Sequence, residues 1–104
     1  MKFTAMKALA AIIIIILSSF SNFSVRQTDI NKGKEVFESK CAKCHGTDGT
    51  KGKWGAKNLQ ISRLADSAMK TMIENGKRIM PAWGKRLTNE EIQSVMDYIK
   101  TLRR

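Results

Sequence analysis

The residues best suited to chemistry in this 104-residue chain form one short motif. The only two cysteines, Cys41 and Cys44, stand three positions apart, and the only histidine, His45, follows directly. On a helical turn, two thiols at this spacing can each bond one vinyl group of a porphyrin, which leaves the imidazole beneath the iron. Cys-x-x-Cys-His is the attachment pattern of haem c, so we predict one haem c, bound through both cysteines, with His45 as an axial ligand.

Cysteine pairs also occur in three other kinds of site, which we compare with this motif. A closed zinc site needs four ligands, whereas this motif supplies three. A thioredoxin-like redox pair follows a strand, whereas a helical pattern precedes Cys41. A simple disulfide between Cys41 and Cys44 remains an alternative to haem attachment.

A second histidine of this chain cannot ligate the iron, because His45 is the only histidine, so the second axial ligand is another residue or is absent. Met80 lies 35 positions further on, directly before Pro81 and beyond Gly76, in an irregular segment where no amphipathic stripe requires a buried side chain. We predict that its thioether ligates the iron on the face opposite His45; an ordinary buried loop methionine is the alternative. Three further methionines fall at helical spacing and are expected in the core: Met69, Met72 and Met96.

Three helices must position these ligands, over residues 30–43, 64–75 and 87–102. Asp29 or Thr28 can cap the first, Gly76 ends the second, and Thr88 with Glu91 forms a capping box for the third. The expected inward stripes are Ile30, Gly33 and Phe37; Ala65, Met69, Met72 and Ile73; and Ile92, Val95, Met96, Ile99 and Leu102. A helical glycine costs about 1 kcal/mol relative to alanine, so we expect another helix to approach closely at Gly33.

The segment from Gly46 to Gly55 has a glycine at every third position. It approaches a phosphate-binding loop, but its spacing is one residue too long and Trp54 stands where serine or threonine would ligate magnesium, so we reject a nucleotide site. We expect a solvated loop that folds over one edge of the cofactor. Trp54 either donates its indole N–H to a haem propionate or acts as a simple hydrophobic cover.

The first residues resemble an export signal, since a basic leader over residues 1–7 precedes an apolar run over residues 8–17. We predict a signal peptide over residues 1–24, cleaved after Ser21 or Ser24, and a domain over residues 25–104 in the periplasm. The alternative is an uncleaved anchor in the inner membrane, because residues 8–25 contain no charge over 18 positions.

The chain has a formal net charge of +10, which suits an acidic partner. Within residues 40–57 and 77–86, one acid, Asp48, stands among nine cations: Lys40, Lys43, Lys51, Lys53, Lys57, Lys77, Arg78, Lys85 and Arg86. We predict a cationic collar around the exposed haem edge that steers the protein to acidic redox partners. A merely solvated basic surface is one alternative, and a nucleic-acid binder with an incidental cysteine pair is another, which the export signal opposes.

In this order the motifs resemble the bacterial class I cytochromes c, and the resemblance covers residues 29–104. The matching pieces are Gly33-Lys34-Glu35-Val36-Phe37, Cys41-Ala42-Lys43-Cys44-His45-Gly46, Asn58-Leu59, Asn75-Gly76-Lys77, Met80-Pro81-Ala82-Trp83 and the helix from Leu87 to Leu102.

The resemblance implies an all-α cytochrome c fold, with three main helices wrapped around one covalently attached haem, and iron ligation by His45 and Met80. It also implies that Gly33 and Phe37 cross the third helix near Tyr98. One departure is the sequence Ala56-Lys57 where the family has Gly-Pro, whose carbonyl accepts the imidazole N–H. We expect the Lys57 carbonyl to accept the same bond.

With both axial positions filled, the iron can exchange electrons but has no vacancy for oxygen or peroxide. We therefore predict a monomeric electron carrier rather than an enzyme, with no nucleic-acid partner. It would transfer single electrons from a quinol-oxidising complex or dehydrogenase to a terminal oxidase or reductase. The alternatives are a membrane-tethered subunit of an oxidase or reductase, and a haem enzyme or sensor if Met80 is not an iron ligand.

Overall fold

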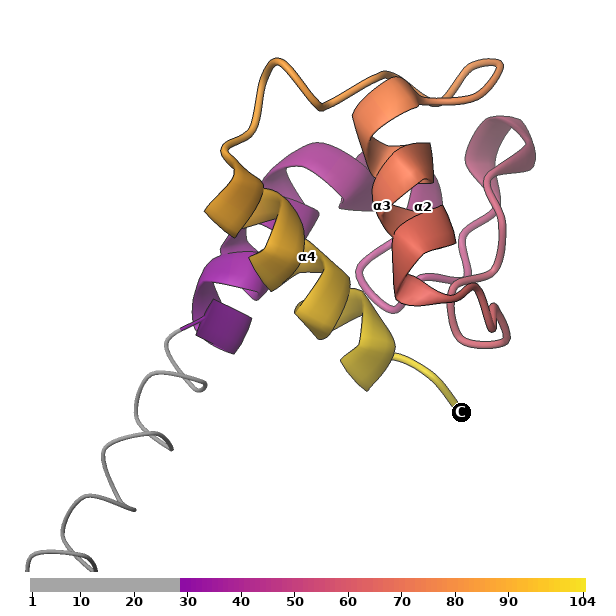
Figure 1. Cartoon of the computed structure of the whole chain (residues 1–104). Helices are drawn as coiled ribbons and strands as arrows, with labels where there is room; N and C mark the ends of the chain where they lie inside the picture. Colours follow the sequence, from indigo (N-terminus) through magenta and orange to yellow (C-terminus); the bar gives the residue numbers. More distant parts are fainter. Residues whose placement is uncertain (1–28) are drawn as a thin grey trace, which may run out of the picture.

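The structure, a computed structural model, describes residues 29–104 (Figure 1). The predicted signal peptide, with its cleavage positions Ser21 and Ser24, lies outside this part of the chain, as does the possible cap Thr28. Within residues 29–104, secondary structure is helical apart from one isolated antiparallel bridge, and no helix has the length and apolarity needed to cross a membrane.

The first helical segment runs over residues 29–45 in three parts. Residues 29–36 are α-helical, η1 (Phe37–Cys41) is a π-helical turn, and α2 (Ala42–His45) completes the segment. The backbone N–H of Ala42 donates to the carbonyl of Phe37 five residues back, which defines the wider turn. The predicted helix over residues 30–43 is thus confirmed, but the hydrophobic period did not predict the π-helical turn.

α4 (Asn89–Thr101) crosses this first segment (Figure 1). The contacts of this crossing lie at Gly33 and Phe37. A Cβ atom on Gly33 would lie 2.0 Å from the carbonyl oxygen of Ser94, so only glycine permits the observed approach. The fully buried Phe37 ring lies 5.3 Å from the Tyr98 ring, centroid to centroid. Both expectations about this crossing are confirmed.

The capping box predicted for α4 is present. Thr88 Oγ1 accepts from the Glu91 backbone N–H at 3.1 Å, and the Glu91 carboxylate accepts from the Thr88 backbone N–H at 3.1 Å. These two bonds satisfy donors that the first turn of a helix otherwise leaves unpaired. The first turn of α4 is therefore fixed by its own sequence.

α3 (Asp66–Asn75) packs against α4, and the Lys100 ammonium lies 3.0 Å from the Asp66 carboxylate between them. The helix begins two residues later than predicted, because Ala65 is its extended N-cap residue and is exposed rather than inward. The helices share one buried core, formed by Val36, Phe37, Met69, Ile73, Ile92, Val95, Met96 and Ile99.

Candidate haem-binding site

The Cys-x-x-Cys-His motif lies at the end of the first helical segment. Cys41 is the last residue of η1, while Cys44 and His45 belong to α2, and all three are half-buried. Cys41 and Cys44 do not form a disulfide with each other. Burial, with a smaller contribution from Cys44, raises the pKa of the Cys41 thiol to about 11. A thiol-redox centre needs a lowered pKa, so this environment is opposed to that alternative.

The His45 imidazole is oriented by the loop that follows it. Its Nδ1 lies 3.0 Å from the carbonyl oxygen of Lys57, and the backbone N–H of Lys51 donates to the His45 carbonyl at 2.8 Å. A histidine ligand whose Nδ1–H is bound to a carbonyl presents the Nε2 lone pair to a metal. The predicted role of the Lys57 carbonyl is confirmed by this hydrogen bond.

The loop returns to the core at Gly49, which is buried and has a φ of 85°. A Cβ atom there would lie 2.9 Å from Leu59 Cβ and 3.5 Å from Leu102 Cδ1. The Leu59 backbone N–H donates to the Gly49 carbonyl at 2.9 Å, so the two ends of the loop are joined just beyond Lys57. This junction is one of the features that keep the Lys57 carbonyl beside His45.

Met80 is presented by a tight turn that follows α3. Lys77 and Met80 exchange two backbone hydrogen bonds, of 3.2 and 3.0 Å, and Arg78 between them has a φ of 54°. A Cβ atom on Gly76, whose φ is 67°, would lie 2.4 Å from the Met80 carbonyl oxygen. Gly76 therefore ends α3 as predicted, and it also admits the Met80 backbone.

The chain after Met80 folds back onto the end of α3. The backbone N–H groups of Trp83 and Gly84 donate to the carbonyls of Ile73 and Glu74, at 2.9 and 3.1 Å. The Trp83 ring packs against the core and lies 5.3 Å from the Arg86 guanidinium. The aromatic residue in the sequence Met-Pro-Ala-Trp was the available signal for this anchor.

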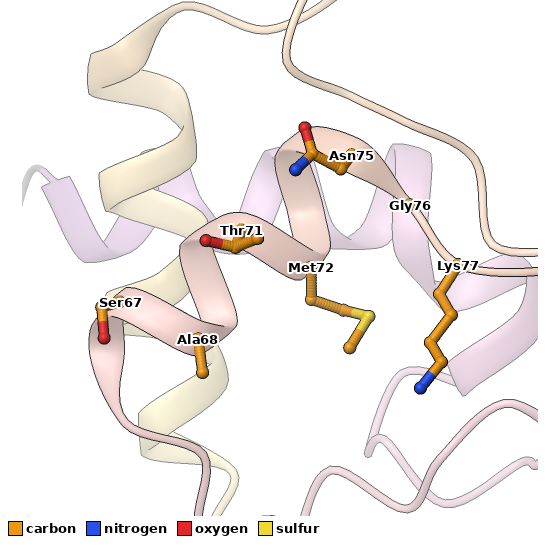
Figure 2. A pocket seen from close by; sticks show the side chains of 7 residues that line it. All are labelled: Ser67, Ala68, Thr71, Met72, Asn75, Gly76 and Lys77. Carbon is orange, nitrogen blue, oxygen red and sulfur yellow. The ribbon is translucent and has the colours of Figure 1, made fainter.

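A cavity of about 490 Å³ lies along α3 and the first residues beyond it. Figure 2 shows the side chains of Met72 and Lys77 pointing into this space. Met72 is half-buried, so the expectation that it fills the core is wrong, whereas Met69 and Met96 are in the core as predicted. The lining residues are Ser67, Ala68, Thr71, Met72, Asn75, Gly76 and Lys77.

These residues fit a haem c better than a bare metal ion. Cys41 and Met80, from segments far apart in sequence, both pack against the same buried core. The donors are two thiols, a thioether and an imidazole with one nitrogen already engaged, a set suited to thioether bonds and two axial ligands. Within residues 29–104, no group of three or more histidine, cysteine or acidic side chains is placed to hold a metal ion.

Trp54 lies in η2 (Lys53–Gly55), a short 3-10 turn that contacts α2. Its side chain is 58% exposed, and the Lys53 ammonium lies 4.4 Å from the centre of its ring. Its role as a hydrophobic cover of the cofactor edge stays a prediction. The alternative role, donation to a haem propionate, stays a prediction.

The sequence matches, over residues 28–99, the family described as cytochrome c oxidase, cbb3-type, subunit III. It is also similar to the cytochrome c6 of Gloeothece citriformis, with 38% identity over 97 residues that cover 86% of this chain and 87% of the relative. The cytochrome c6 of Rippkaea orientalis is 37% identical over 106 residues, which cover 90% of this chain and 92% of the relative. The chain therefore belongs to the class I c-type cytochromes and is a monohaem electron carrier with one covalently attached haem c.

Proposed function

We propose that Cys41 and Cys44 bind the haem, that His45 and Met80 ligate its iron, and that the protein carries single electrons between acidic redox partners. The observation that supports this proposal most directly is the 3.0 Å hydrogen bond between His45 Nδ1 and the Lys57 carbonyl. This bond fixes the imidazole tautomer and orientation that an iron ligand requires.

Bound haem supplies a reversible one-electron couple between ferrous and ferric iron. The residues of the chain decide how that couple is used. With His45 and Met80 both holding the iron, the thioether would favour the ferrous state relative to two nitrogen ligands, and oxygen would find no free position. Because Gly76 and the Lys77–Met80 backbone bonds hold Met80 in place, the same ligands can stay bound in both oxidation states.

Replacement of the proposed ligand tests the site. In Met80→Ala we expect the ferric absorption band of thioether-bound iron to disappear and the midpoint potential to fall, while the pyridine haemochrome spectrum still reports one attached haem. Met72→Ala is the matched control, because Met72 is half-buried on α3 and should leave the band in place. An unchanged potential in Met80→Ala would refute the ligand pair, and high-spin ferric iron in the unmodified protein would favour the haem enzyme or sensor.

The charge distribution supports an acidic partner. The nine cations of residues 40–57 and 77–86 are exposed, apart from the partly buried Lys53, and the acids Glu90, Glu91 and Asp97 lie on α4 instead. Opposite charges on two proteins accelerate their encounter, and added salt screens this effect. We expect the rate of electron transfer with donor and acceptor complexes to fall as ionic strength rises, which stopped-flow oxidation would measure. The proposed donor is a quinol-oxidising complex or dehydrogenase, and the proposed acceptor is a terminal oxidase or reductase.

We propose that residues 1–24 direct export and are removed, so that residues 25–104 act in the periplasm as a free carrier. The second candidate function is that of a tethered oxidase subunit, which the description of the matched family favours. Mass spectrometry of the native N-terminus separates the two. A new N-terminus near residue 22 or 25 supports the free carrier, whereas the intact leader in a membrane fraction that also contains oxidase activity supports the subunit.

A further inference from the structure

One aromatic residue of the basic surface has a conformation that its burial does not explain. Trp54 has a φ of 52° and a ψ of 34°, which is the left-handed region, although it is not a glycine. For a bulky L-residue this conformation is energetically unfavourable. Burial of the ring could offset such a cost, but the side chain is 58% exposed.

The turn around Trp54 is nevertheless well defined. Gly52 and Gly55 also have positive φ values, of 65° and 80°, and the backbone N–H of Gly55 donates to the Gly52 carbonyl at 3.3 Å. The next residue, Ala56, donates to the Lys53 carbonyl at 3.1 Å. The ring is thus held outward by a hydrogen-bonded turn, and an exposed aromatic side chain with few rotatable bonds is a common anchor in protein interfaces.

The turn is surrounded in sequence by positive charge. Lys51, Lys53 and Lys57 flank Trp54, and the ion pairs found within residues 29–104 involve other lysines, on the helices. The one nearby acid, Asp48, accepts hydrogen bonds from the hydroxyl and the backbone N–H of Thr50, at 2.8 and 3.0 Å. An apolar centre with a rim of unneutralised lysines suits a partner surface whose apolar recess is bordered by carboxylates.

The position of the turn connects it with the haem site. η2 contacts α2, which ends at His45, and Lys57 is both three residues after Trp54 and the acceptor for the His45 imidazole. A protein bound at this turn would therefore lie close to the segment that presents the axial histidine. Electron transfer through a small, transient interface needs a short distance between the haem of this protein and the cofactor of its partner.

We propose that the η2 turn is the docking surface for an acidic redox partner, with Trp54 inserted into an apolar recess of that partner. Lys53 stays over the Trp54 ring, and Lys51 and Lys57 face the carboxylates of the partner. This inference rests on the proposed function as an electron carrier. It adds that affinity depends on one aromatic contact, which salt does not screen, as well as on the lysines, whose contribution salt does screen.

The test compares oxidation of the ferrous holoprotein by washed membranes of the native host with oxidation by hexacyanoferrate(III), an anion too small to use a protein docking surface. The variant is Trp54→Asn, because asparagine tolerates a positive φ and removes only the ring. The control is Ile61→Ala, since Ile61 is 69% exposed and lies outside the turn. With membranes we expect kcat/KM of Trp54→Asn to fall about tenfold through a higher KM, and Ile61→Ala to match the unmodified protein. With hexacyanoferrate(III) all three proteins should react at similar rates.

The dependence of the oxidation rate on ionic strength distinguishes the contribution of the Trp54 ring from that of the lysines. For Trp54→Asn the fold-change relative to the unmodified protein should persist at high salt, whereas Lys51→Gln should converge with the unmodified protein. Membrane oxidation of Trp54→Asn at the unmodified rate would overturn the docking inference alone. Slower reaction of that variant with hexacyanoferrate(III) as well would also overturn it, by placing the effect at the haem. If the unmodified protein exchanges no electrons with the membranes, the proposed function fails first.

Discussion

His45 and Met80, the two proposed iron ligands, are presented by segments of contrasting construction. The helix that carries His45 is held by buried side chains, since Gly33 touches the α4 backbone and Phe37 is fully buried beside Tyr98. The loop that carries Met80 is held by glycine geometry and backbone hydrogen bonds, and Ile79, beside the ligand, is 65% exposed.

This difference indicates that the two sides of the haem respond differently to mutation. Disruption of the His45 side removes part of the hydrophobic core and therefore destabilises the whole protein. Disruption of the Met80 side releases a few main-chain contacts of a surface loop, so it should change ligation more than global stability. The predictions below test this contrast.

The largest effect is expected when the haem cannot be attached. A Cys41→Ala, Cys44→Ala variant should lose most of its helix content. A hydrophobic core this small contributes only about 3–5 kcal/mol to the free energy of unfolding, so the domain needs the attached cofactor to stay folded. Far-UV circular dichroism would measure the loss. Native helix content in this variant would show that the described helices fold without the cofactor.

Gly33→Ala should be the most destabilising single change on the His45 side. Its Cβ would lie 2.0 Å from the Ser94 carbonyl oxygen, and overpacking of this kind costs about 3 kcal/mol. Denaturant unfolding of the holoprotein would measure the loss, with the exposed Lys34→Ala as control, for which we expect a change within about 0.5 kcal/mol. The molecules that remain folded should keep the ferric thioether band, because the Met80 loop is untouched.

Gly76→Ala should reverse this pattern on the Met80 side. Alanine is strained at a φ of 67°, and its Cβ would lie 2.4 Å from the Met80 carbonyl oxygen, so the turn has to open. We expect the ferric thioether band to weaken and the midpoint potential to fall, with a loss of stability of about 1–3 kcal/mol. A variant with reduced stability but an intact band would contradict the contrast between the two sides.

A smaller effect is expected at the start of α4, which supports the first helix without contributing a ligand. Thr88→Ala removes the side-chain acceptor of the capping box and should destabilise the protein by about 1 kcal/mol, as thermal unfolding would show. Neither the thioether band nor the potential should move. A shift of the potential would mean that the ligand loop senses the N-terminus of α4.

The smallest effect concerns pH. Hydrogen bonds from Thr88, the backbone N–H first, lower the pKa of the Glu91 carboxyl below its ordinary value of 4.5. The capping contribution of Glu91 is therefore complete above that value and is lost as the pH falls through the lowered pKa. Glu91→Gln should flatten the acid side of the stability profile slightly relative to the unmodified protein. Identical acid profiles would show that the carboxylate makes no measurable contribution.

Patterns in the amino-acid sequence predicted much of the fold. The predicted ends of the three helices all lie within two residues of the observed ends, and the spacing of Thr88 and Glu91 predicted a capping box that is present. The 3.6-residue period misplaced Met72, because α3 has the core on one face and a cavity on another, and both faces accept apolar side chains. The period also gave no sign of the π-helical turn at Phe37–Cys41, where one turn holds an additional residue.

The sequence by itself determined the chemistry of this protein, since side-chain type and spacing define the Cys-x-x-Cys-His motif, the amphipathic stripes and the excess of cations. Tertiary structure decided how the proposed ligands are held. The Lys57 carbonyl accepts a hydrogen bond from the His45 imidazole, and the absence of a Cβ atom at Gly76 lets the Met80 backbone approach. Tertiary structure also decided that Trp54 points outward from a left-handed turn. These contacts depend on the backbone. Every residue carries a carbonyl group, so only the path of the folded chain selects the one that meets the imidazole.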